Sequence, residues 1–395
     1  MKRYNHSPLI QGGSSLNYGK QKGVAEIFRN VVFRVDSSTV IGVGHVMRCL
    51  TLAHALKNLG WNISFVCRKF EGNLIDYIQK QGFYVKELPQ QPFAIAADTS
   101  HPYAQWLGVG WKEDAEATIA YLKELKAKVD WLIVDHYAID HNWESAVRSY
   151  ATRIFVIDDL ANRFHDCDLL LDQNLVPEMN TRYVPLVSKR TRVLIGPQYA
   201  LLRPEFRAIR DQSSHEKHNG STNRQSILIF LGGSDPTNET LKAIKATELA
   251  GLPNVLIDVV IGSSNPHRDT LESYCLHLSN VTLYIQTPNM PQLLSKACLI
   301  IGAGGINTWE RCCLGKPTII LTIAENQVSI AKEIHRYGAA MYLGNAQDVQ
   351  MEFLSGVITE LFNDKRRLAL MSQSASSLVD GKGVEKVVFE LYGKN

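Results

Sequence analysis

The stretch that decides the fold runs from residue 31 to residue 68, where "VVFRVD" (31–36), "HVMRCLTLAHALKNLG" (45–60) and "WNISFVCR" (61–68) follow one another. The first and third segments are rich in β-branched and aromatic residues and predict buried strands. The middle segment carries apolar residues at three-residue spacing and predicts a helix, with Gly60 in the C′ position after its last turn. A strand, a helix and a second strand in this order form a βαβ unit, which predicts a parallel sheet.

The same alternation of strand and helix continues to about residue 199 and restarts at residue 226. Between the two series lies "IRDQSSHEKHNGSTNRQ" (209–225), a polar stretch typical of a linker or an exposed insertion. We therefore predict an α/β protein of two Rossmann-type doubly wound domains, in which ligands bind at the carboxyl ends of the strands. The predicted divisions are a flexible N-terminal extension (1–28), a first domain (29–208), the polar linker (209–225) and a second domain (226–395).

Composition narrows the classes of function. The chain has 395 residues, more than a single core of ordinary size needs. Its 42 lysines and arginines against 39 acidic residues leave a formal charge of +3, which is too small to indicate a nucleic-acid partner. The seven cysteines lack the spacing of a disulfide framework, and no apolar run approaches the ~20 residues of a membrane span. We expect a cytoplasmic protein with neither nucleic acid nor membrane as a partner.

A glycine turn with a histidine, "IGVGHVMRC" (41–49), stands where the first predicted strand ends and the first predicted helix begins. Gly42 and Gly44 allow a ligand to approach the backbone closely. The partial positive charge of the helix N-terminus disfavours a charged imidazole at His45 by about 0.3–1 kcal/mol, so we expect the neutral ring that a general base needs. Asp36, at the end of the strand, is predicted to orient His45 or to contact a substrate amide.

Two other interpretations of this turn stay open. A histidine at this position can simply cap the helix or be satisfied in the core. The turn is also similar to a dinucleotide-binding fingerprint, although Met47 stands where the third glycine belongs. In that case Arg68 and Lys69, after the second strand, would accommodate the 2′-phosphate of NADP.

The second domain contains another glycine turn in "LIFLGGSDPTN" (228–238). A buried strand leads into Gly232, Gly233 and Ser234, and a helix is expected to begin near Pro236. The backbone amides of such a turn can bind a diphosphate. The alternative is a tight turn in which Asp235 caps the helix.

A third glycine turn, Gly302 to Gly305, opens the stretch "GAGGINTWERCCLGKPTIILTIAENQ" (302–327). Glu310 lies about one turn inside the helix that follows, where a carboxylate can accept hydrogen bonds from both hydroxyls of a ribose. The alternative role for Glu310 is to interact with the helix dipole. Asn326 and Gln327 follow the next strand at the same edge of the sheet. Two glycine turns with an acid beyond the second favour a nucleotide-diphosphate sugar as the ligand.

These stretches together resemble the UDP-sugar hydrolases of pseudaminic acid biosynthesis, a family with a GT-B-like fold similar to that of MurG-type glycosyltransferases. The resemblance covers residues 31 to 392 approximately. It implies hydrolysis of UDP-2,4-diacetamido-2,4,6-trideoxy-β-L-altropyranose to UDP and the free sugar, with water attacking the anomeric carbon and inverting it. It also implies a place in surface polysaccharide synthesis or flagellin glycosylation. The motifs that carry it are "RVDSSTVIGVGHVMRCLTLAHAL", "VDHYAID", "VIDDLANR", "DLLLDQN", "YALLRPEF", "LGGSDPTN" and "GAGG…TWERCCLGKP…AENQ".

The resemblance also implies roles for individual residues. His45 matches the family's base, Tyr137 and Asn326 match positions near the substrate, and Glu310 matches the acid that holds the uridine ribose. The chain departs from the family pattern at Ile306 and Asn307, where small hydroxyl residues are expected, so phosphate contacts should rest on backbone amides and Thr308. The predicted substrate contacts are Asp36, Gly42, Gly44, Arg48, Tyr137, Gly232, Gly233, Ser234, Gly304, Gly305, Thr308, Glu310, Asn326 and Gln327.

No metal site or cofactor is predicted, because the chain has no suitably placed D-x-D, no H-E-x-x-H and no cysteine cluster. "HEKH" (215–218) has the wrong spacing for a zinc helix and is expected to be solvated. Asp158 and Asp159 form either an acid–base pair or a strand-end turn in which Asp159 faces solvent or caps. The predicted partner is a UDP-sugar, with no obligate protein partner. Two alternatives remain: a GT-B glycosyltransferase that uses a UDP-sugar donor, and a non-catalytic nucleotide-sugar binding module.

Overall fold

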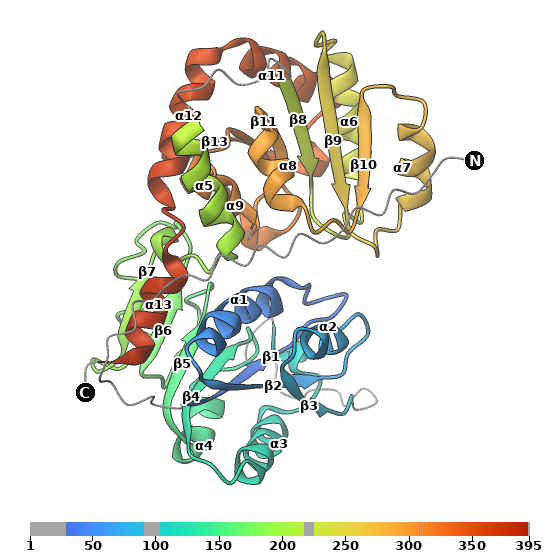
Figure 1. The fold of residues 1–395 in the computed structure, drawn as a ribbon. Helices are drawn as coiled ribbons and strands as arrows, with labels where there is room; N and C mark the ends of the chain where they lie inside the picture. The colour runs from blue at the N-terminus through green and yellow to red at the C-terminus, as the bar shows by residue number, and fades with distance from the viewer. Residues whose placement is uncertain (1–28, 91–102, 217–224, 306, 394–395) are drawn as a thin grey trace.

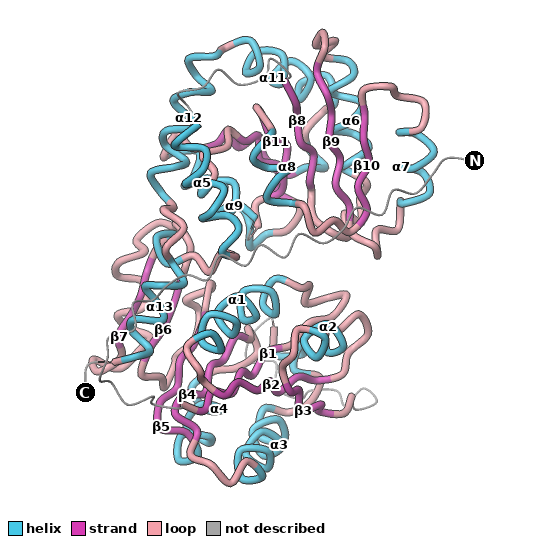
Figure 2. Tube along the Cα trace, in the orientation of Figure 1, coloured by secondary structure: helices cyan, strands magenta, loops and turns pink. Residues whose placement is uncertain are grey.

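The computed structural model of the chain describes residues 29–90, 103–216, 225–305 and 307–393 (Figure 1). The predicted N-terminal extension (1–28) lies outside these residues. The described chain forms two parallel sheets, one from each βαβ series, and each sheet has helices on both faces (Figure 2). The prediction of two Rossmann-type domains is therefore confirmed.

The first domain is built on a seven-stranded parallel sheet with the strand order β3-β2-β1-β4-β5-β6-β7. Because the chain reverses its winding direction at β1, the turn after β1 opens beside the end of β4. The register places Val35 of β1 next to Asp135 of β4. The strands are β1 (Asn30–Val35), β2 (Asn62–Arg68), β3 (Tyr84–Leu88), β4 (Val129–Asp135), β5 (Ala151–Ile157), β6 (Leu169–Asp172) and β7 (Arg192–Ile195).

The two faces of this sheet bury separate apolar clusters. Phe33 and Val35 pack on one face against α1, and Val32 packs on the opposite face against α3 and α4, as the alternation of side chains along a strand requires. Gly60 has φ +81° and follows α1 as predicted, since glycine adopts this left-handed conformation without steric cost. The helices are α1 (Gly44–Asn58), α2 (Ile75–Lys80), α3 (Trp111–Glu124) and α4 (His141–Val147), with 3₁₀ turns η1 (Ala104–Leu107), η2 (Arg148–Tyr150) and η3 (Pro197–Tyr199).

The second domain repeats the plan with a six-stranded parallel sheet in the order β10-β9-β8-β11-β12-β13. Here the winding reverses at β8, so the glycine turns after β8 and β11 open at the same edge. The strands are β8 (Gln225–Phe230), β9 (Val255–Ile261), β10 (Val281–Ile285), β11 (Leu299–Ala303), β12 (Thr318–Thr322) and β13 (Ala340–Asn345). The helices are α6 (Glu239–Leu249), α7 (Arg268–Cys275), α8 (Met290–Lys296), α9 (Asn307–Cys313), α10 (Val328–Arg336), α11 (Met351–Asn363) and α12 (Lys365–Leu378), with 3₁₀ turns η4 (Glu325–Gln327) and η5 (Ala346–Asp348).

The chain connects the two domains twice. The first connection leads from η3 into α5 (Pro204–Glu216), whose Phe206 is buried in the core of the second domain. α5 extends into the predicted linker, so residues 209–216 are helical, and residues 217–224 lie outside the described part of the chain. The second connection returns the last helix, α13 (Gly383–Tyr392), to the first domain, where Val387 and Leu391 join the core beside α1 (Figure 1).

Gly383 makes the second connection possible. A Cβ atom at this position would lie 2.2 Å from the carbonyl oxygen of Ala200, so only glycine allows the two connections to touch. Within the described ranges, no helix combines the length and the apolar character that crossing a bilayer requires.

Candidate active site

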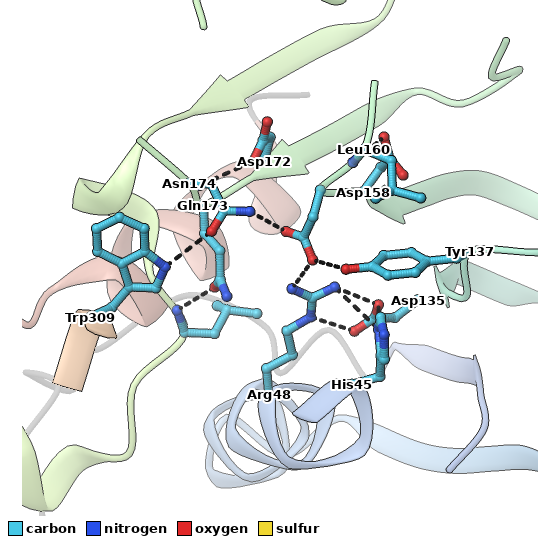
Figure 3. Close-up of polar contacts among 12 residues, drawn as sticks. His45, Arg48, Asp135, Tyr137, Asp158, Leu160, Asp172, Gln173, Asn174 and Trp309 are labelled. Atoms are coloured by element: carbon cyan, nitrogen blue, oxygen red, sulfur yellow. Dashed lines mark hydrogen bonds and ion pairs between the residues drawn. The ribbon is translucent and has the colours of Figure 1, made fainter. Parts of the chain in front are cut away.

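The carboxyl ends of four neighbouring strands of the first sheet carry the candidate site (Figure 3). His45 is the second residue of α1, directly after the glycine turn that follows β1. Asp135 ends β4, Asp159 follows β5 and Asn174 follows β6. The sheet therefore brings together four side chains that are far apart in the sequence.

The glycine turn before His45 is tight. The amide of Gly42 donates to the carbonyl oxygen of Ser38 at 2.9 Å, and Gly42 has φ +79°, which favours glycine. The helix that follows the turn, α1, begins at Gly44 and has no side-chain cap at its N-terminus. The first amides of α1 are therefore available to a ligand next to His45.

His45 is oriented by Asp135. The Nδ1 atom of His45 lies 2.6 Å from Oδ1 of Asp135, and the imidazole side chain is 10% exposed. Burial alone would raise the pKa of Asp135, but Arg48 and His45 hold it well below its ordinary value. Because an ionised carboxylate only accepts hydrogen bonds, Nδ1 of His45 carries the hydrogen of this bond, and Nε2 would be the acceptor of a neutral ring.

Arg48 does not lie open to a substrate, contrary to the prediction. Its Nε and Nη2 atoms donate to the two oxygens of Asp135 at 2.6 and 2.7 Å, and its Nη1 donates to Asp159 at 2.7 Å. Burial alone would lower the pKa of Arg48, but the two carboxylates raise it well above its ordinary value. The guanidinium is 3% exposed and links the carboxylates behind His45.

Tyr137 lies beside His45, and its place near the substrate stays a prediction. Its ring meets the imidazole edge-on, with centroids 4.6 Å apart and an interplanar angle of 87°. Its hydroxyl donates to Asp159 at 2.9 Å, and burial together with this carboxylate raises the pKa of Tyr137 well above its ordinary value. Tyr103 and Trp106 extend the aromatic cluster, with ring centroids 5.2 and 5.7 Å from that of Tyr137.

Asp158 and Asp159 do not form an acid–base pair. Asp158 is fully buried, faces Arg163 at 2.7 Å and accepts from the amide of Ala161 at 2.8 Å, so it is a structural strand-end residue. The expectation that Asp159 faces solvent or caps is wrong. Asp159 is 12% exposed, and its oxygens accept hydrogen bonds from Arg48, Tyr137 and Asn174 (Figure 3).

Asp36 does not orient His45, and this prediction is also wrong. Its carboxylate is fully buried, lies 2.7 Å from Arg34 and 3.2 Å from Nε2 of His136, and accepts from the amide of Arg68 at 2.6 Å. A side chain without exposed surface cannot contact a substrate. Arg68 is likewise buried and pairs with Asp114 at 2.7 Å, so its guanidinium is not placed to bind the 2′-phosphate of NADP.

The turn Gly232–Ser234 follows β8 at the edge of the second sheet. Gly233 and Ser234 are exposed, and no described residue accepts a hydrogen bond from the amides of Gly232, Gly233 or Ser234. The close approach of the neighbouring loop depends on Gly262, where a Cβ would lie 2.5 Å from the carbonyl oxygen of Gly233. The turn thus presents three amides for which the described protein supplies no acceptor.

The helix after this turn begins later than predicted, at Glu239 instead of near Pro236. The buried carboxylate of Asp235 accepts from the amides of Glu239 at 3.0 Å and Thr240 at 2.7 Å. Asp235 therefore caps α6, and these two amides of its first turn are occupied by the protein itself.

Gly304 and Gly305 follow β11 at the same edge, and Glu310 lies in the first turn of α9. Glu310 is partly exposed and accepts from Asn307 at 2.6 Å, and burial raises its pKa against the effect of nearby Arg203. Thr308 is buried and its hydroxyl accepts from Arg311 at 2.8 Å, so it faces the interior instead of the edge. Ile306 lies outside the described residues.

Asn326 and Gln327 lie in η4, after β12. Asn326 is exposed, while the side-chain oxygen of Gln327 accepts from the amide of Ile323 at 3.0 Å. A Cβ on Gly304 would lie 3.2 Å from Cβ of Gln327, so these two predicted residues pack against each other. Residues 217–218 of "HEKH" lie outside the described part. In the parts of the chain that the structure describes, no group of three or more His, Cys, Asp or Glu side chains is arranged to hold a metal ion.

Sequence reasoning missed two partners of the site. Asp135 lies in the quoted motif "VDHYAID" but only Tyr137 was selected from it, and Asn174 lies in "DLLLDQN". Their signal was their position at the carboxyl ends of β4 and β6, at the same edge of the doubly wound sheet as the turn after β1.

Comparisons with known proteins agree with this architecture. Residues 227–387 match the glycosyltransferase family 28 C-terminal domain. The spore coat polysaccharide biosynthesis protein SpsG of Bacillus subtilis (strain 168) is 26% identical over 347 residues, which cover 88% of this chain and 93% of that protein. The crystal structure of Acinetobacter baumannii MurG has a TM-score of 0.62 at 16% identity and covers 92% of this chain and 99% of that one, a likeness of fold.

A further relative is the UDP-2,4-diacetamido-2,4,6-trideoxy-β-L-altropyranose hydrolase of Campylobacter jejuni subsp. jejuni serotype O:2, which is 29% identical over 309 residues. The match covers 78% of this chain and 97% of that hydrolase. The resemblance predicted from the motifs is confirmed: the chain is similar to this hydrolase, has a GT-B-like fold and matches the glycosyltransferase family 28 C-terminal domain over residues 227–387.

Proposed function

We propose that the protein is an enzyme that hydrolyses UDP-2,4-diacetamido-2,4,6-trideoxy-β-L-altropyranose to UDP and the free sugar. The observation that carries this proposal is the His45–Asp135 pair, in which Asp135 holds Nδ1 at 2.6 Å and leaves Nε2 as an acceptor. The likeness to the hydrolase of Campylobacter jejuni supports the choice of substrate.

In the proposed reaction Nε2 of His45 takes a proton from a water molecule. The water oxygen forms a bond to the anomeric carbon from the face opposite to UDP, and the bond from that carbon to the phosphate oxygen breaks. UDP leaves with the electron pair of the broken bond, and the configuration at the anomeric carbon is inverted. Asp135 would stabilise the imidazolium that forms. General-base catalysis of this kind is typically worth about 10²–10⁴ in rate.

The second domain would hold the leaving group. The amides of Gly232, Gly233 and Ser234 and the turn Gly304–Gly305 are proposed to bind the diphosphate, where preorganised donors stabilise developing negative charge. Glu310 would accept hydrogen bonds from the ribose, and Asn326 would contact the substrate from η4. Because these donors already face the negative charge, we propose that the reaction needs no metal ion and no cofactor.

The wider setting follows from the same proposal. A UDP-sugar would be the ligand, in the synthesis of pseudaminic acid or a related surface polysaccharide, and the protein would act in the cytoplasm. The name of the relative from Bacillus subtilis, which refers to spore coat polysaccharide, supports the broader of these settings. Flagellin glycosylation is a narrower use of the same product.

A second candidate is a glycosyltransferase with the same architecture, in which an acceptor hydroxyl replaces water. The match of residues 227–387 to the glycosyltransferase family 28 C-terminal domain favours it. A third, a non-catalytic nucleotide-sugar binding module, would make His45 dispensable.

One experiment separates the three candidates. Purified protein is incubated with the UDP-sugar in buffer, with and without EDTA, and released UDP is measured. UDP release that needs no acceptor and survives EDTA supports metal-independent hydrolysis. Release only after an acceptor is added supports the transferase, and binding without release supports the module. Strict restoration of activity by Mg²⁺ or Mn²⁺ after EDTA would reject metal independence.

A further inference from the structure

We propose that Asn174 is a positioning residue that ties the second domain to the catalytic histidine: it holds Asp159 against Arg48 while it accepts the indole hydrogen of Trp309 in α9. This inference rests on the proposed function, since it assigns Asn174 a part in the hydrolysis at His45. It concerns a continuous series of hydrogen bonds between the two domains (Figure 3).

Asn174 is bonded at both ends of its side-chain amide. The Nδ2 atom donates to Oδ1 of Asp159 at 2.9 Å, and the Oδ1 atom accepts from Nε1 of Trp309 at 3.1 Å. Asn174 is 5% exposed and Trp309 is 1% exposed, so both bonds are largely shielded from water. An asparagine amide can donate on one side and accept on the other, whereas a carboxylate in this place could only accept.

The series continues from Asp159 to the imidazole. Asp159 accepts from Arg48 through Oδ2 at 2.7 Å, and Arg48 in turn binds both oxygens of Asp135. Asp135 holds Nδ1 of His45 at 2.6 Å. If Asp159 shifts, Arg48 loses one of its two anchors, and the carboxylate that orients His45 loses its fixed partner.

The other end of the series lies in the nucleotide half of the proposed site. Trp309 is packed in the core of the second domain and precedes Glu310, the proposed ribose ligand, by one residue. A displacement of α9 that moved Glu310 would therefore also strain the bond to Asn174. The orientation of His45 therefore depends, through this series of bonds, on the position of α9. The base is correctly oriented when the two domains are docked.

Two variants break the series at different bonds. Asn174→Ala removes both hydrogen bonds, and Trp309→Phe removes only the indole donor while keeping an aromatic ring in the core. Trp143→Phe is the matched control, because the indole of Trp143 also donates a buried hydrogen bond, at 3.0 Å to Asp114, outside the series.

In hydrolysis of the UDP-sugar we expect kcat to fall about 10- to 100-fold for Asn174→Ala and Trp309→Phe, as loss of orientation does. The Kd for UDP, measured by calorimetry, should change by less than about threefold. Trp143→Phe should keep the wild-type kcat. Thermal unfolding identifies any variant that does not fold, and if Asn174→Ala does not, Trp309→Phe decides the question alone.

The pH profile gives a readout that a merely structural role would not move. Among the described residues, the charged and titratable groups in contact with His45 are Asp135 from β4, Arg48 from α1 and Tyr137 from the loop after β4. Asp159, from the loop after β5, binds Arg48 and Tyr137. Asn174→Ala loosens Asp159 from Arg48 and leaves more positive charge near the ring, so the acidic limb of kcat/KM should move to lower pH. Asn174→Asp adds a negative charge and should move this limb to higher pH.

Opposite shifts in the two Asn174 variants, with a lower kcat in Trp309→Phe, support the proposal. Folded Asn174→Ala and Trp309→Phe proteins with wild-type kcat and an unmoved acidic limb would overturn it while leaving the proposed hydrolysis intact. A wild-type protein that releases no UDP would instead refute the proposed function itself.

Discussion

Two buried arginines, Arg48 and Arg311, distinguish the domains. Each lies in the helix after a glycine turn, and each is 3% exposed. Arg48 pairs with Asp135 and Asp159, whose carboxylates raise its pKa well above its ordinary value although burial opposes this. Arg311 donates to the carbonyl oxygen of Ala303 and the hydroxyl of Thr308, and burial lowers its pKa to about 10. No carboxylate in the described residues forms an ion pair with Arg311.

The difference teaches how the proposed work is divided. In the described part of the first domain, the charges of Arg48, Asp135 and Asp159 pair with one another behind His45, and Nε2 of His45 is the proposed acceptor. The second domain keeps a positive charge, Arg311, against Gly302 and Ala303 at the end of β11, and it presents amides at Gly232–Ser234 with no described protein acceptor. We infer that the first domain acts through a side chain, whereas the second acts through backbone donors suited to an anion.

The largest effect is expected from Asp135→Asn, which removes the carboxylate that pairs with Arg48 and His45 in the first domain. An amide cannot serve both Arg48 and Nδ1 of His45 as the carboxylate does, so we expect kcat to fall about 10²–10⁴-fold. The Kd for UDP should stay within about threefold of the wild-type value. Steady-state UDP release and calorimetry measure the two quantities.

The control for this variant is Asp130→Asn, the same substitution at the opposite end of β4, where the carboxylate accepts from the amide of Asn30 at 2.8 Å and lies outside the His45 site. It should retain wild-type kcat. A folded Asp135→Asn protein with wild-type kcat would show that the pair with His45 has no role in the reaction.

The next largest effect tests the second domain. Glu310→Gln replaces the proposed ribose acceptor by a neutral amide, and loss of hydrogen bonds to a charged group costs about 1.5–3 kcal/mol. The Kd for UDP should therefore rise about 10- to 100-fold. Glu272→Gln, on the surface helix α7, should leave the Kd unchanged. Equal UDP affinity in wild type and Glu310→Gln would place the ribose elsewhere.

A smaller effect concerns Arg311, the charge that lies against Gly302 in β11. In Gly302→Ala the new Cβ would lie 2.0 Å from Nη1 of Arg311, so the guanidinium must move, and we expect a loss of about 1–3 kcal/mol in the free energy of unfolding. Gly305→Ala meets no atom within 4 Å and should change stability by less than about 0.5 kcal/mol. Denaturant unfolding measures both, and equal stabilities would contradict the packing argument.

The smallest effect is a pH dependence in the first domain. Burial and the nearby carboxylate of Asp159 raise the pKa of Asp172 from 3.8 to about 7. Between these values the folded protein binds more protons than the unfolded chain, so the contribution of Asp172 to stability falls as pH rises from about 4 to about 7.

Asp172→Asn removes this titration. The difference in Tm between variant and wild type should therefore be a few degrees more favourable to the variant at pH 8 than at pH 4.5. Thermal unfolding of both proteins at the two pH values measures it. A difference in Tm that does not depend on pH would contradict the raised pKa.

Much of the fold could be predicted because apolar patterns and glycine turns are local signals. The strands and helices of "VVFRVD" to "WNISFVCR" follow from a few residues each. The return of α13 to the first domain could not be predicted, since an amphipathic pattern does not specify which core it will contact. The start of α6 was predicted too early because Pro236 is a residue type favoured in the first turn of a helix. Asp235 instead has φ +38° in a turn and caps the helix from there, so that α6 begins at Glu239.

The site was predictable only in part, for a similar reason. His45 could be selected because its glycine turn surrounds it in sequence. Its partner Asp135 is 90 positions away and reaches it only because β4 lies next to β1 in the sheet. Arg48 was assigned to the substrate because a sequence gives the charge of a side chain but not the carboxylates that neutralise it.

The most direct test of the account compares wild type with His45→Gln, which retains a polar side chain but cannot act as the base. Released UDP is measured with the UDP-diacetamido sugar in water, without acceptor, beside the Kd of each protein for UDP. We expect wild type to release UDP and the variant to lose about 10²–10⁴ in kcat with an unchanged Kd. Equal rates of release from the two folded proteins would contradict it.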